Sequence, residues 1–421
     1  MKKQLIILAA LLPLLGGCVY DFEANLTGDQ YTVVIEGDIM VGGTITVNFT
    51  RLNPEVLEGN KNNNQTKAIY EPGWGIPVSF YAKVEGEDGS IVEGEPSWGS
   101  CKLDTRSLRP DVRYRLHVYD QIQGDHYVSS WESVQGGPVI DSLSYKVSGD
   151  HLDVRVTFHS DGSTPYYCLA QDEEWEYHAN TTTRFRYIPS GGAEPEGGIQ
   201  LFPTWESHYG DSYGRIFDTP ELYPNYTCWD STIKGVTTII TTGAMASNKM
   251  VDFVYRTLDK HDRRISVKYR SMVSLRMVSK ESFAYWESLE QASTQTGDLF
   301  SPIPSILHGN IINQEKPSAQ VIGYIGVSEL VTRDIFIKNE DIHLYRQPAD
   351  LYDNLMKAAI GSGDQRGVKI FEMAQRYAQG YRPWTTEVSD DNLFYVWILE
   401  DCMDCRMLGG STQKPKDWPD E

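Results

Sequence analysis

The strongest constraint on the fold is a two-residue alternation of apolar and polar side chains in short segments. In "TITVNFTR", residues 44–51, the apolar residues Ile45, Val47 and Phe49 fall on one face, because successive strand side chains point to opposite sides of a sheet. The segments "VRYRLHVYD" and "LDVRVTF" repeat the pattern. Strands with one apolar face are typical of antiparallel sheets that cover a core on one side. This alternation predicts a β-sandwich.

Glycine-containing turns separate these strands, and a break at Gly136-Gly137-Pro138 precedes a new series. We therefore expect a mainly β chain with a few helices. An immunoglobulin/fibronectin-like β-sandwich at residues 31–137 would be followed by a larger β-rich domain at residues 138–421. Helix patterns and caps predict helices at residues 279–296, 350–360 and 364–379, the first with Ser279 as its N-cap.

The first residues predict secretion and lipidation. Two lysines precede the apolar run Leu5–Leu15, and two glycines stand directly before Cys18. A run this short cannot span a bilayer, which takes about 20 apolar residues. Leu-Gly-Gly-Cys matches the lipobox of bacterial lipoproteins, so we expect residues 1–17 to be removed and Cys18 to carry the lipid, palmitate being one such acyl chain. Residues 18–30 would form the lipidated tether.

Charge limits the partners of the mature chain. The formal net charge is −20, and removal of the signal with its two lysines makes it −22. An acidic surface repels nucleic acid and anionic headgroups, so we expect neither as a ligand. With 40% hydrophobic residues, 25 Tyr and 10 Trp, the chain is suited to folded domains.

A search for catalytic motifs finds neither a nucleophile elbow, nor a zinc-protease helix, nor a phosphate loop. Glu174 and Glu176 lie two apart in "QDEEWEY", and a glycosidase needs two carboxylates about 5 to 9.5 Å apart. Any acidic strand offers such a pair, so we expect an ion-paired or solvated face. The nine histidines show no ligand spacing, and His178 and His208 are interpreted as packing or surface residues. We predict no metal and no cofactor.

Five cysteines remain besides Cys18, and in an oxidising compartment they favour disulfides over a zinc site, which would need four ligands. We expect Cys402 to pair with Cys405, and Cys168 with Cys228, while the pairing of Cys101 stays open. The C-x-x-C motif lies near the chain end in a β-rich context, whereas a thioredoxin-like site needs it at a helix start.

A Gly, Pro and Tyr-rich excursion at residues 189–226 is too long for a simple hairpin loop, and it is our candidate binding lip. Loop aromatics present flat apolar faces to sugar rings or peptide side chains. The candidate contact residues for a ligand or partner are Trp205, Tyr209, Tyr213, Tyr223 and Tyr226.

The tail "CMDCRMLGGSTQKPKDW", residues 402–418, resembles the terminal signature of a Bacteroidota lipoprotein family catalogued as domain of unknown function 4249. Further hallmarks are "EEWEY" at 173–177, "CWD" at 228–230, "AYWESLEQASTQTGDLFSPIPSILHGN" at 284–310 and "VIGYIGVSE" at 321–329. The sequence departs from the pattern in the expanded region 345–382 and in Asp417 before Trp418. Several hallmark residues are of turn and packing types expected to serve the fold: Pro302, Pro304, Gly309, Asn310, Gly323, Tyr324, Trp175, Tyr177 and Trp286.

The resemblance implies an outer-membrane lipoprotein without established enzyme activity, commonly linked to TonB-dependent transporters. Asp21 and Glu23 resemble the acidic export tag of surface lipoproteins, which favours the cell surface. We therefore expect a non-catalytic accessory of a TonB-dependent transporter in nutrient capture. The alternative is a free-standing surface protein that binds a glycan or peptide, and a hydrolase ranks third.

Overall fold

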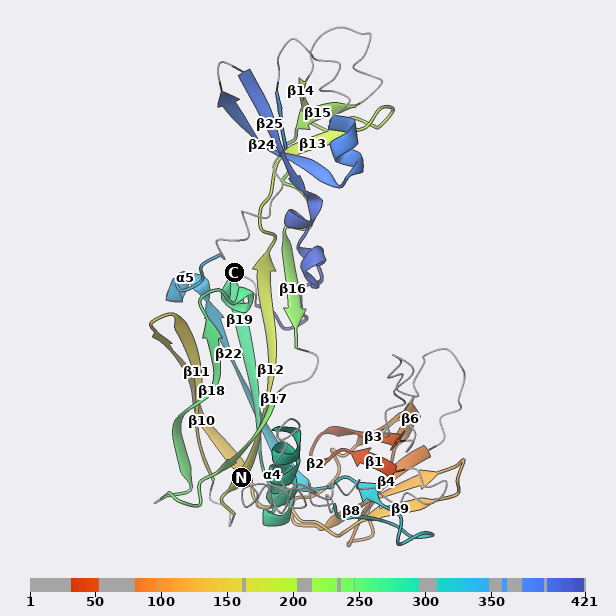
Figure 1. Ribbon diagram of the computed structural model, residues 1–421. Coiled ribbons are helices and arrows are strands. Elements are labelled where there is room, and N and C mark those ends of the chain that lie inside the picture. Colours follow the sequence, from red (N-terminus) through yellow and green to blue (C-terminus); the bar gives the residue numbers. More distant parts are fainter. Residues whose placement is uncertain are drawn as a thin grey trace, which may run out of the picture.

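The computed structural model describes residues 32–52, 80–97, 99–160, 164–202, 214–232, 236–245, 247–294, 309–347, 358–361, 373–389 and 392–419. Its strands build two β-sandwiches and a smaller β module at one end, here called the first sandwich, the second sandwich and the apical module (Figure 1). The predicted fold class, mainly β with an N-terminal sandwich followed by a larger β-rich part, is confirmed.

The first sandwich packs two five-stranded sheets face to face. One sheet has the order β21-β1-β3-β7-β6 and the other β20-β9-β8-β4-β5. The strands are β1 (Thr32–Glu36), β3 (Thr44–Leu52), β4 (Phe80–Gly86), β5 (Ile91–Glu93), β6 (Glu95–Ser97), β7 (Ser100–Asp104), β8 (Tyr114–Asp120), β9 (His126–Ser129), β20 (Ile311–Asn313) and β21 (Val321–Ile322). The alternating residues Ile45, Val47 and Phe49 on β3 enter the core, as the sequence pattern predicts.

The second sandwich packs the sheet β10-β11-β18 against a sheet of order β16-β12-β19-β22-β2, in which β17 also pairs with β12. The strands are β2 (Ile39–Val41), β10 (Pro138–Ser148), β11 (His151–Ser160), β12 (Tyr166–His178), β16 (Thr227–Ser231), β17 (Val236–Thr241), β18 (Lys249–Asp259), β19 (Lys268–Met277) and β22 (Val327–Lys338). The short helix η2 (Arg263–Ile265) follows the end of β18, and the short helix α5 (Asn339–Ile342) follows the end of β22. In each sandwich, the first two strands of an antiparallel series lie beside a later strand in one sheet, as in the A-B-E order of immunoglobulin-like domains. The order is β1-β3-β7 in the first sandwich and β10-β11-β18 in the second.

The two sandwiches exchange strands. β2, from the N-terminal part of the chain, pairs in parallel with β22 of the second sandwich, with Ile39 opposite Val327. In return, β20 and β21 complete the two sheets of the first sandwich, with Ile311 opposite Ser129. The predicted first domain of residues 31–137 therefore lacks two strands that come from much later in the chain. Domains predicted as continuous ranges of residues cannot include strands that are exchanged between the two sandwiches.

Asn310 fixes the returning segment to the first sandwich. Its side-chain oxygen accepts from the Ile325 N–H at 2.8 Å, and its amide nitrogen donates to the Ile325 carbonyl and the Ser130 hydroxyl, both at 2.9 Å. Gly309 passes so close to Gly323 that a Cβ at Gly309 would lie 1.7 Å from the Gly323 carbonyl oxygen. Gly309, Asn310 and Gly323 thus serve the fold, as predicted, whereas Pro302 and Pro304 lie outside the described residues.

The helix predictions have different outcomes. Helix α4 (Lys280–Thr294) matches the first, and Ser279 caps it by accepting a hydrogen bond of 3.1 Å from the Ser282 N–H. The second prediction, 350–360, is wrong at its end, because residues 358–361 form strand β23 paired with β25. Ala358 and Ala359 are good helix formers, but their pairing with Trp397 and Val396 of β25 overrides this local propensity. Residues 350–357 lie outside the described residues. Within the predicted 364–379, residues 373–378 are helical.

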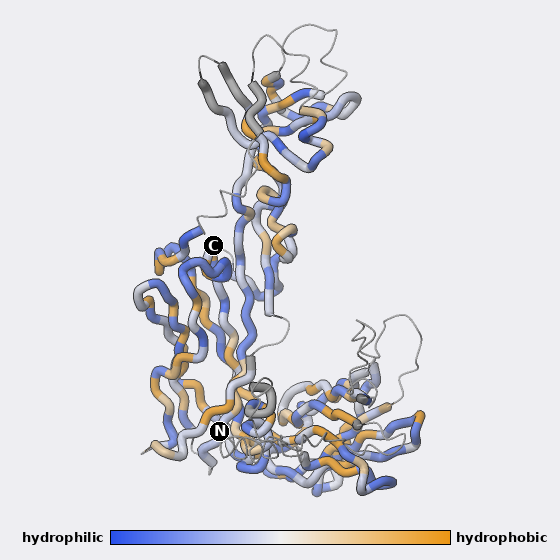
Figure 2. The backbone as a smooth tube through the Cα atoms, in the orientation of Figure 1, coloured by the Kyte–Doolittle hydropathy of each residue, from blue (hydrophilic) through white to orange (hydrophobic). Residues whose placement is uncertain are grey.

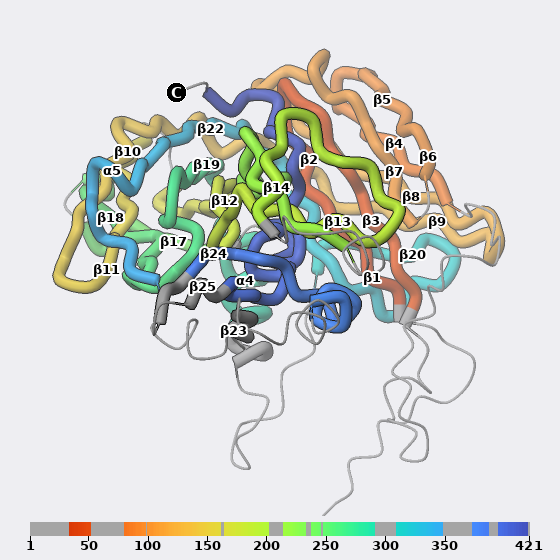
Figure 3. Tube along the Cα trace, turned by 90° about the horizontal axis from the view of Figure 1, so that it is seen from above, coloured from red at the N-terminus to blue at the C-terminus, as the bar shows by residue number. Residues whose placement is uncertain are grey.

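The apical module is inserted between β12 and β16 and is completed by the last part of the chain. It contains the sheets β13-β15-β14 and β23-β25-β24, formed by β13 (Phe185–Ile188), β14 (Ile199–Phe202), β15 (Arg215–Asp218), β23 (Ala358–Gly361), β24 (Tyr381–Ser389) and β25 (Asn392–Leu399). Tyr187, Ile216, Tyr395 and Trp397 form its own buried core. The hydropathy colouring shows apolar stretches along the strands of each part (Figure 2). The view from above shows the strands of the second sandwich on one side of the molecule and those of the first sandwich on the other (Figure 3).

Candidate functional site

Three chain segments form the stem that carries the apical module. β12 leaves the second sandwich and continues into the stem, where the Ala179 N–H donates to the Tyr226 carbonyl at 2.7 Å and the Thr181 N–H to the Cys402 carbonyl at 3.0 Å. The chain after β25 returns through the short helices η3 (Glu400–Cys402) and η4 (Cys405–Leu408). The module is therefore held to the second sandwich by backbone hydrogen bonds among all three segments.

A disulfide between Cys228 on β16 and Cys405 locks this stem. The predicted pairs Cys402–Cys405 and Cys168–Cys228 are wrong. Cys228 lies opposite Tyr177 near the end of β12, while Cys168 lies nine residues back along that strand, roughly 30 Å away at strand rise. Cys402 is instead buried beside Ile398 and Met403, and its thiol is free, as are those of Cys101 and Cys168.

The family-like tail also packs as structure. Trp229 and Ser411 form a β-bridge, and a Cβ at Gly410 would lie 2.5 Å from the Tyr177 hydroxyl oxygen. Trp418 is buried, and its ring meets Phe336 edge-on with centroids 5.4 Å apart. The tail signature therefore reflects how the end of the chain closes the second sandwich.

Two of the predicted lip residues are engaged in packing. Tyr223 is half-buried, its hydroxyl bonds to the Glu400 carboxylate, and the Arg186 guanidinium lies over its ring at 4.9 Å. Burial raises the pKa of Tyr223 to about 12. Tyr226 stacks on His178 with centroids 4.5 Å apart. These rings pack within the stem, and both residues are only partly exposed. The other predicted lip residues, Trp205, Tyr209 and Tyr213, lie outside the described residues, as do His208 and Cys18.

The apical module exposes two large apolar side chains that no sequence pattern singles out. Ile199 on β14 is 67% exposed, and Leu222 in the loop after β15 is 54% exposed. Arg186 fixes that loop by donating to the carbonyls of Glu221 and Leu222 at 3.2 and 2.6 Å. Single exposed apolar side chains are common on protein surfaces, so these two residues mark positions for an experiment and do not by themselves define an interface. In the sequence, Ile199 and Leu222 are recognisable only as apolar residues within a Gly- and Pro-rich stretch.

The acidic side chains of Glu173, Glu174 and Glu176 on β12 each accept a hydrogen bond from a neighbouring side chain. Glu173 is only 3% exposed, and both its oxygens accept from Arg256 at 3.0 Å, with Arg264 adding a bond of 2.9 Å. Glu174 accepts from Arg270 at 3.0 Å, and Glu176 from the indole N–H of Trp418 at 3.0 Å. Glu174 and Glu176 share the outer face, as their spacing predicts, but both are held by these partners. The geometry fits an ion-paired face.

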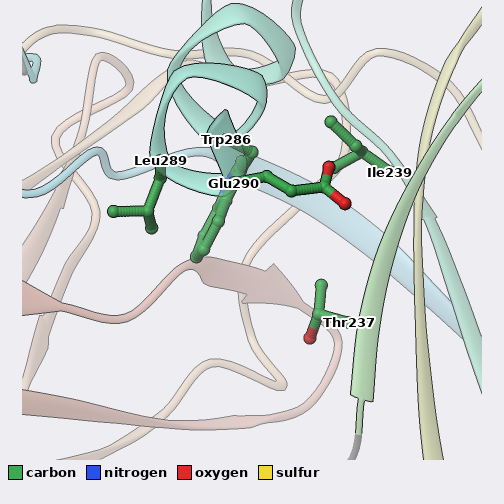
Figure 4. Close-up of a pocket in the computed structure, with 5 residues that line it drawn as sticks. All are labelled: Thr237, Ile239, Trp286, Leu289 and Glu290. Atoms are coloured by element: carbon green, nitrogen blue, oxygen red, sulfur yellow. The ribbon is translucent and has the colours of Figure 1, made fainter. Parts of the chain in front are cut away.

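A small pocket of about 310 Å³ lies between α4 and β17 (Figure 4). Trp286 and Leu289 line it from the helix, Thr237 and Ile239 from the strand, and the Glu290 side chain reaches across from α4. Trp286, predicted to be a core residue, is only partly buried here. The volume of the pocket is at the lower end of the range for ligand sites, about 300 to 1,000 Å³. The pocket could hold a small, mainly apolar group.

Two negative findings apply to the part of the chain that the structure describes. No group of three or more His, Cys, Asp or Glu side chains is arranged to hold a metal ion there. No helix within those residues has the length and apolar character needed to cross a membrane.

The sequence matches the model of a family described as "Domain of unknown function (DUF4249)" over residues 19–334. No curated protein matches the chain. Among the solved structures with a match is a two fibronectin type-III domain segment from chicken tenascin, at 9% sequence identity and a TM-score of 0.16, covering 59% of this chain and 91% of the tenascin chain. The sandwich order described above rests on the strand pairing itself.

Proposed function

This chain belongs to the family described as domain of unknown function DUF4249, and from that membership we propose that it is a non-catalytic outer-membrane lipoprotein that assists a TonB-dependent transporter in nutrient capture. The lipobox ending at Cys18 and the resemblance to Bacteroidota lipoproteins support the membrane and the class of bacterium. The acidic residues just after Cys18 favour display on the cell surface.

The observation that carries the proposal is the apical module. It is a separate β unit with its own core, and strand β12, the returning tail and the Cys228–Cys405 disulfide hold it on the second sandwich. It presents Ile199 and Leu222 to solvent. A lipid at Cys18 would confine the protein to the membrane surface, which raises its effective concentration toward a neighbouring barrel. Even a modest apical interface would then hold a complex.

The partners of Glu174 and Glu176 argue against hydrolysis by this particular pair of carboxylates. The carboxylates that could have formed a glycosidase pair, Glu174 and Glu176, each accept a hydrogen bond from an ordered side chain. A general acid needs a free, poised carboxyl group within reach of a substrate. The alternative function, free-standing capture of a glycan or peptide, is favoured by the small pocket between α4 and β17.

The proposal is tested by co-purification from the native membrane. We expect the tagged protein, extracted in mild detergent at native expression, to bring down a TonB-dependent transporter. Cys18→Ser should abolish acylation and membrane retention, and with them the complex. Recovery of the protein without a transporter, combined with unchanged uptake in a deletion strain, would favour the free-standing binder. Unchanged membrane retention of Cys18→Ser would refute the lipid anchor.

A further inference from the structure

The pocket between α4 and β17 is lined by side chains that two regular elements direct toward each other. Trp286, Leu289 and Glu290 are three and four positions apart on α4, so they share one face of the helix. Thr237 and Ile239 are two apart on β17, so they share one face of the strand. The lining is therefore positioned by the packing of a helix against a strand, which favours a preformed site.

The Trp286 ring supplies the largest apolar wall of the pocket. The buried Tyr285 ring meets it at an interplanar angle of 82°, with centroids 5.9 Å apart, and so restrains its orientation. The indole Nε1 atom is itself buried and has no hydrogen-bond partner among the described residues. Carbon atoms of the ring therefore line the pocket, and the N–H group does not. Among aromatic side chains, indole is the strongest partner for a cation.

The charge at the pocket is negative. Glu290 is the charged residue among the described ones that line it, and its side chain extends from α4 toward β17 (Figure 4). The other charged residues of the helix are Glu281, Glu287 and, in the first turn, Lys280. The formal net charge of the whole chain is −20. A field of this sign raises the local concentration of cations and repels anions.

These features select among classes of ligand. An anion would meet the like charge of Glu290 and no basic side chain among the described lining residues. A neutral apolar group would displace water from the carboxylate without replacing its hydrogen bonds. A sugar ring carries hydroxyls around its whole rim, whereas only Thr237 and Glu290 offer polar side-chain groups to them. An organic ammonium group matches both the carboxylate and the indole ring, and its alkyl part matches the apolar walls.

We propose that the pocket between α4 and β17 binds an organic ammonium group attached to a short apolar body. The Trp286 ring makes the cation–π contact, Glu290 supplies the opposite charge, and Leu289 and Ile239 pack against the alkyl part. A volume of about 310 Å³ suffices for one such group and is too small for a folded partner. A free amine and the lysine side chain of a peptide share this chemistry.

The test is isothermal titration of the whole mature protein with choline and with its neutral carbon analogue, in which a tert-butyl group replaces the trimethylammonium group. We expect choline to bind one site about 10-fold more tightly than the analogue, because the two differ in charge and hardly in shape. Nα-acetyl-lysine amide is titrated in parallel. Tighter binding of the lysine compound assigns the pocket to a peptide side chain, and tighter binding of choline assigns it to a free small molecule.

Two variants and one matched control locate the site. Glu290→Gln should weaken choline binding by about 2 to 5-fold and leave the affinity for the neutral analogue unchanged. Trp286→Leu should weaken choline binding by about 3 to 30-fold. Glu287→Gln makes the same change of charge at an exposed position of α4 that does not line the pocket, and it should bind choline like the parent. Trp286 is half-buried, so its variant is interpreted only if thermal unfolding remains cooperative.

The proposal is overturned if neither choline nor the lysine compound binds, or if the neutral analogue binds as tightly as choline, which would make the pocket a purely apolar site. It is also overturned if Glu290→Gln keeps the parental preference for choline, which would locate the cation elsewhere. The inference rests on the alternative function, free-standing capture, whose ligand class it names. Its failure would leave the co-purification of a transporter unaffected, and uptake in the deletion strain would still report capture at another surface.

Discussion

The hydroxyl of Tyr177 donates a hydrogen bond of 2.7 Å to the carbonyl of Cys405 and accepts one of 3.0 Å from the Gly410 N–H. One buried side chain on β12 therefore anchors the tail at both ends of η4. Because the same tail closes the stem of the apical module, the position of that module depends on how the end of the chain docks on the second sandwich.

Loss of the stem disulfide should destabilise the protein strongly. Cys228 and Cys405 lie 177 positions apart, and a cross-link over so long a loop contributes about 5 kcal/mol in the chain-entropy model. We expect Cys228→Ser to lower the free energy of unfolding by an amount of that order, whereas Cys402→Ala should have a much smaller effect. Alkylation of the unreduced, unfolded protein should label Cys101, Cys168 and Cys402. A disulfide-linked peptide joining Cys402 to Cys405 would contradict the pairing.

Glu173 should contribute far more to the free energy of unfolding than its neighbour Glu174. Glu173→Gln leaves Arg256 and Arg264 facing a neutral group in a buried site, and breaking a buried ion pair costs about 3 to 5 kcal/mol. Glu174→Gln removes a partly exposed pair with Arg270 and should cost less than about 1 kcal/mol. Urea unfolding monitored by tryptophan fluorescence distinguishes the two. Equal losses would mean that the Glu173 network is not buried.

Asn310 should hold the strand exchange between the sandwiches. Asn310→Ala deletes its hydrogen bonds with both backbone groups of Ile325, leaving these without their partner at a cost of about 1 to 3 kcal/mol. Amide hydrogen exchange in β20 and β21 should accelerate before that of β3 or β8. Ser130→Ala removes a single contact of the same side chain and is the control. Unchanged protection of β20 in Asn310→Ala would show that the exchange is held elsewhere.

The stem should lose stability in mild acid because of His178. Burial lowers its pKa below the ordinary 6.5, so the unfolded chain takes up the proton more readily than the folded one. The contribution of neutral His178 is complete above pH 6.5 and falls as the pH drops toward the folded-state pKa. We expect His178→Phe, which keeps a ring against Tyr226, to reduce the difference in Tm between pH 8 and pH 5.5. Part of the pH dependence of Tm should remain in this variant, because His117 and His126 also have lowered pKa values. An unchanged difference in Tm would exclude His178 as its source.

The sequence predicted what depends on local pattern. Alternation placed Ile45, Val47 and Phe49 in a sandwich core, and Ser279 marked the start of α4, because strand faces and helix caps are properties of a few consecutive residues. The disulfide could not be found in this way. Cys405 meets Cys228 only after β16 pairs with β12 and the tail folds back, so the nearer Cys402 was the wrong partner.

The candidate site was predicted least well for the same reason. Tyr223 and Tyr226 were expected on a loop surface, but the tail supplies Glu400 and β12 supplies His178 to pack them. The paired carboxylates Glu174 and Glu176 share a face as expected, while their partners Arg270 and Trp418 come from distant segments. Exposure and pairing are decided by contacts between segments that are remote in sequence.

The most direct test of the proposed function is site-specific photo-crosslinking in the native outer membrane. A photoreactive residue would replace Ile199 or Leu222 on the apical module, with Ile91 on the first sandwich and Val251 on the second as equally exposed controls. The accessory role predicts that the apical positions capture a TonB-dependent transporter and that the control positions capture it weakly or not at all. Absence of a transporter adduct from all four positions, with the protein present at the membrane, would contradict it.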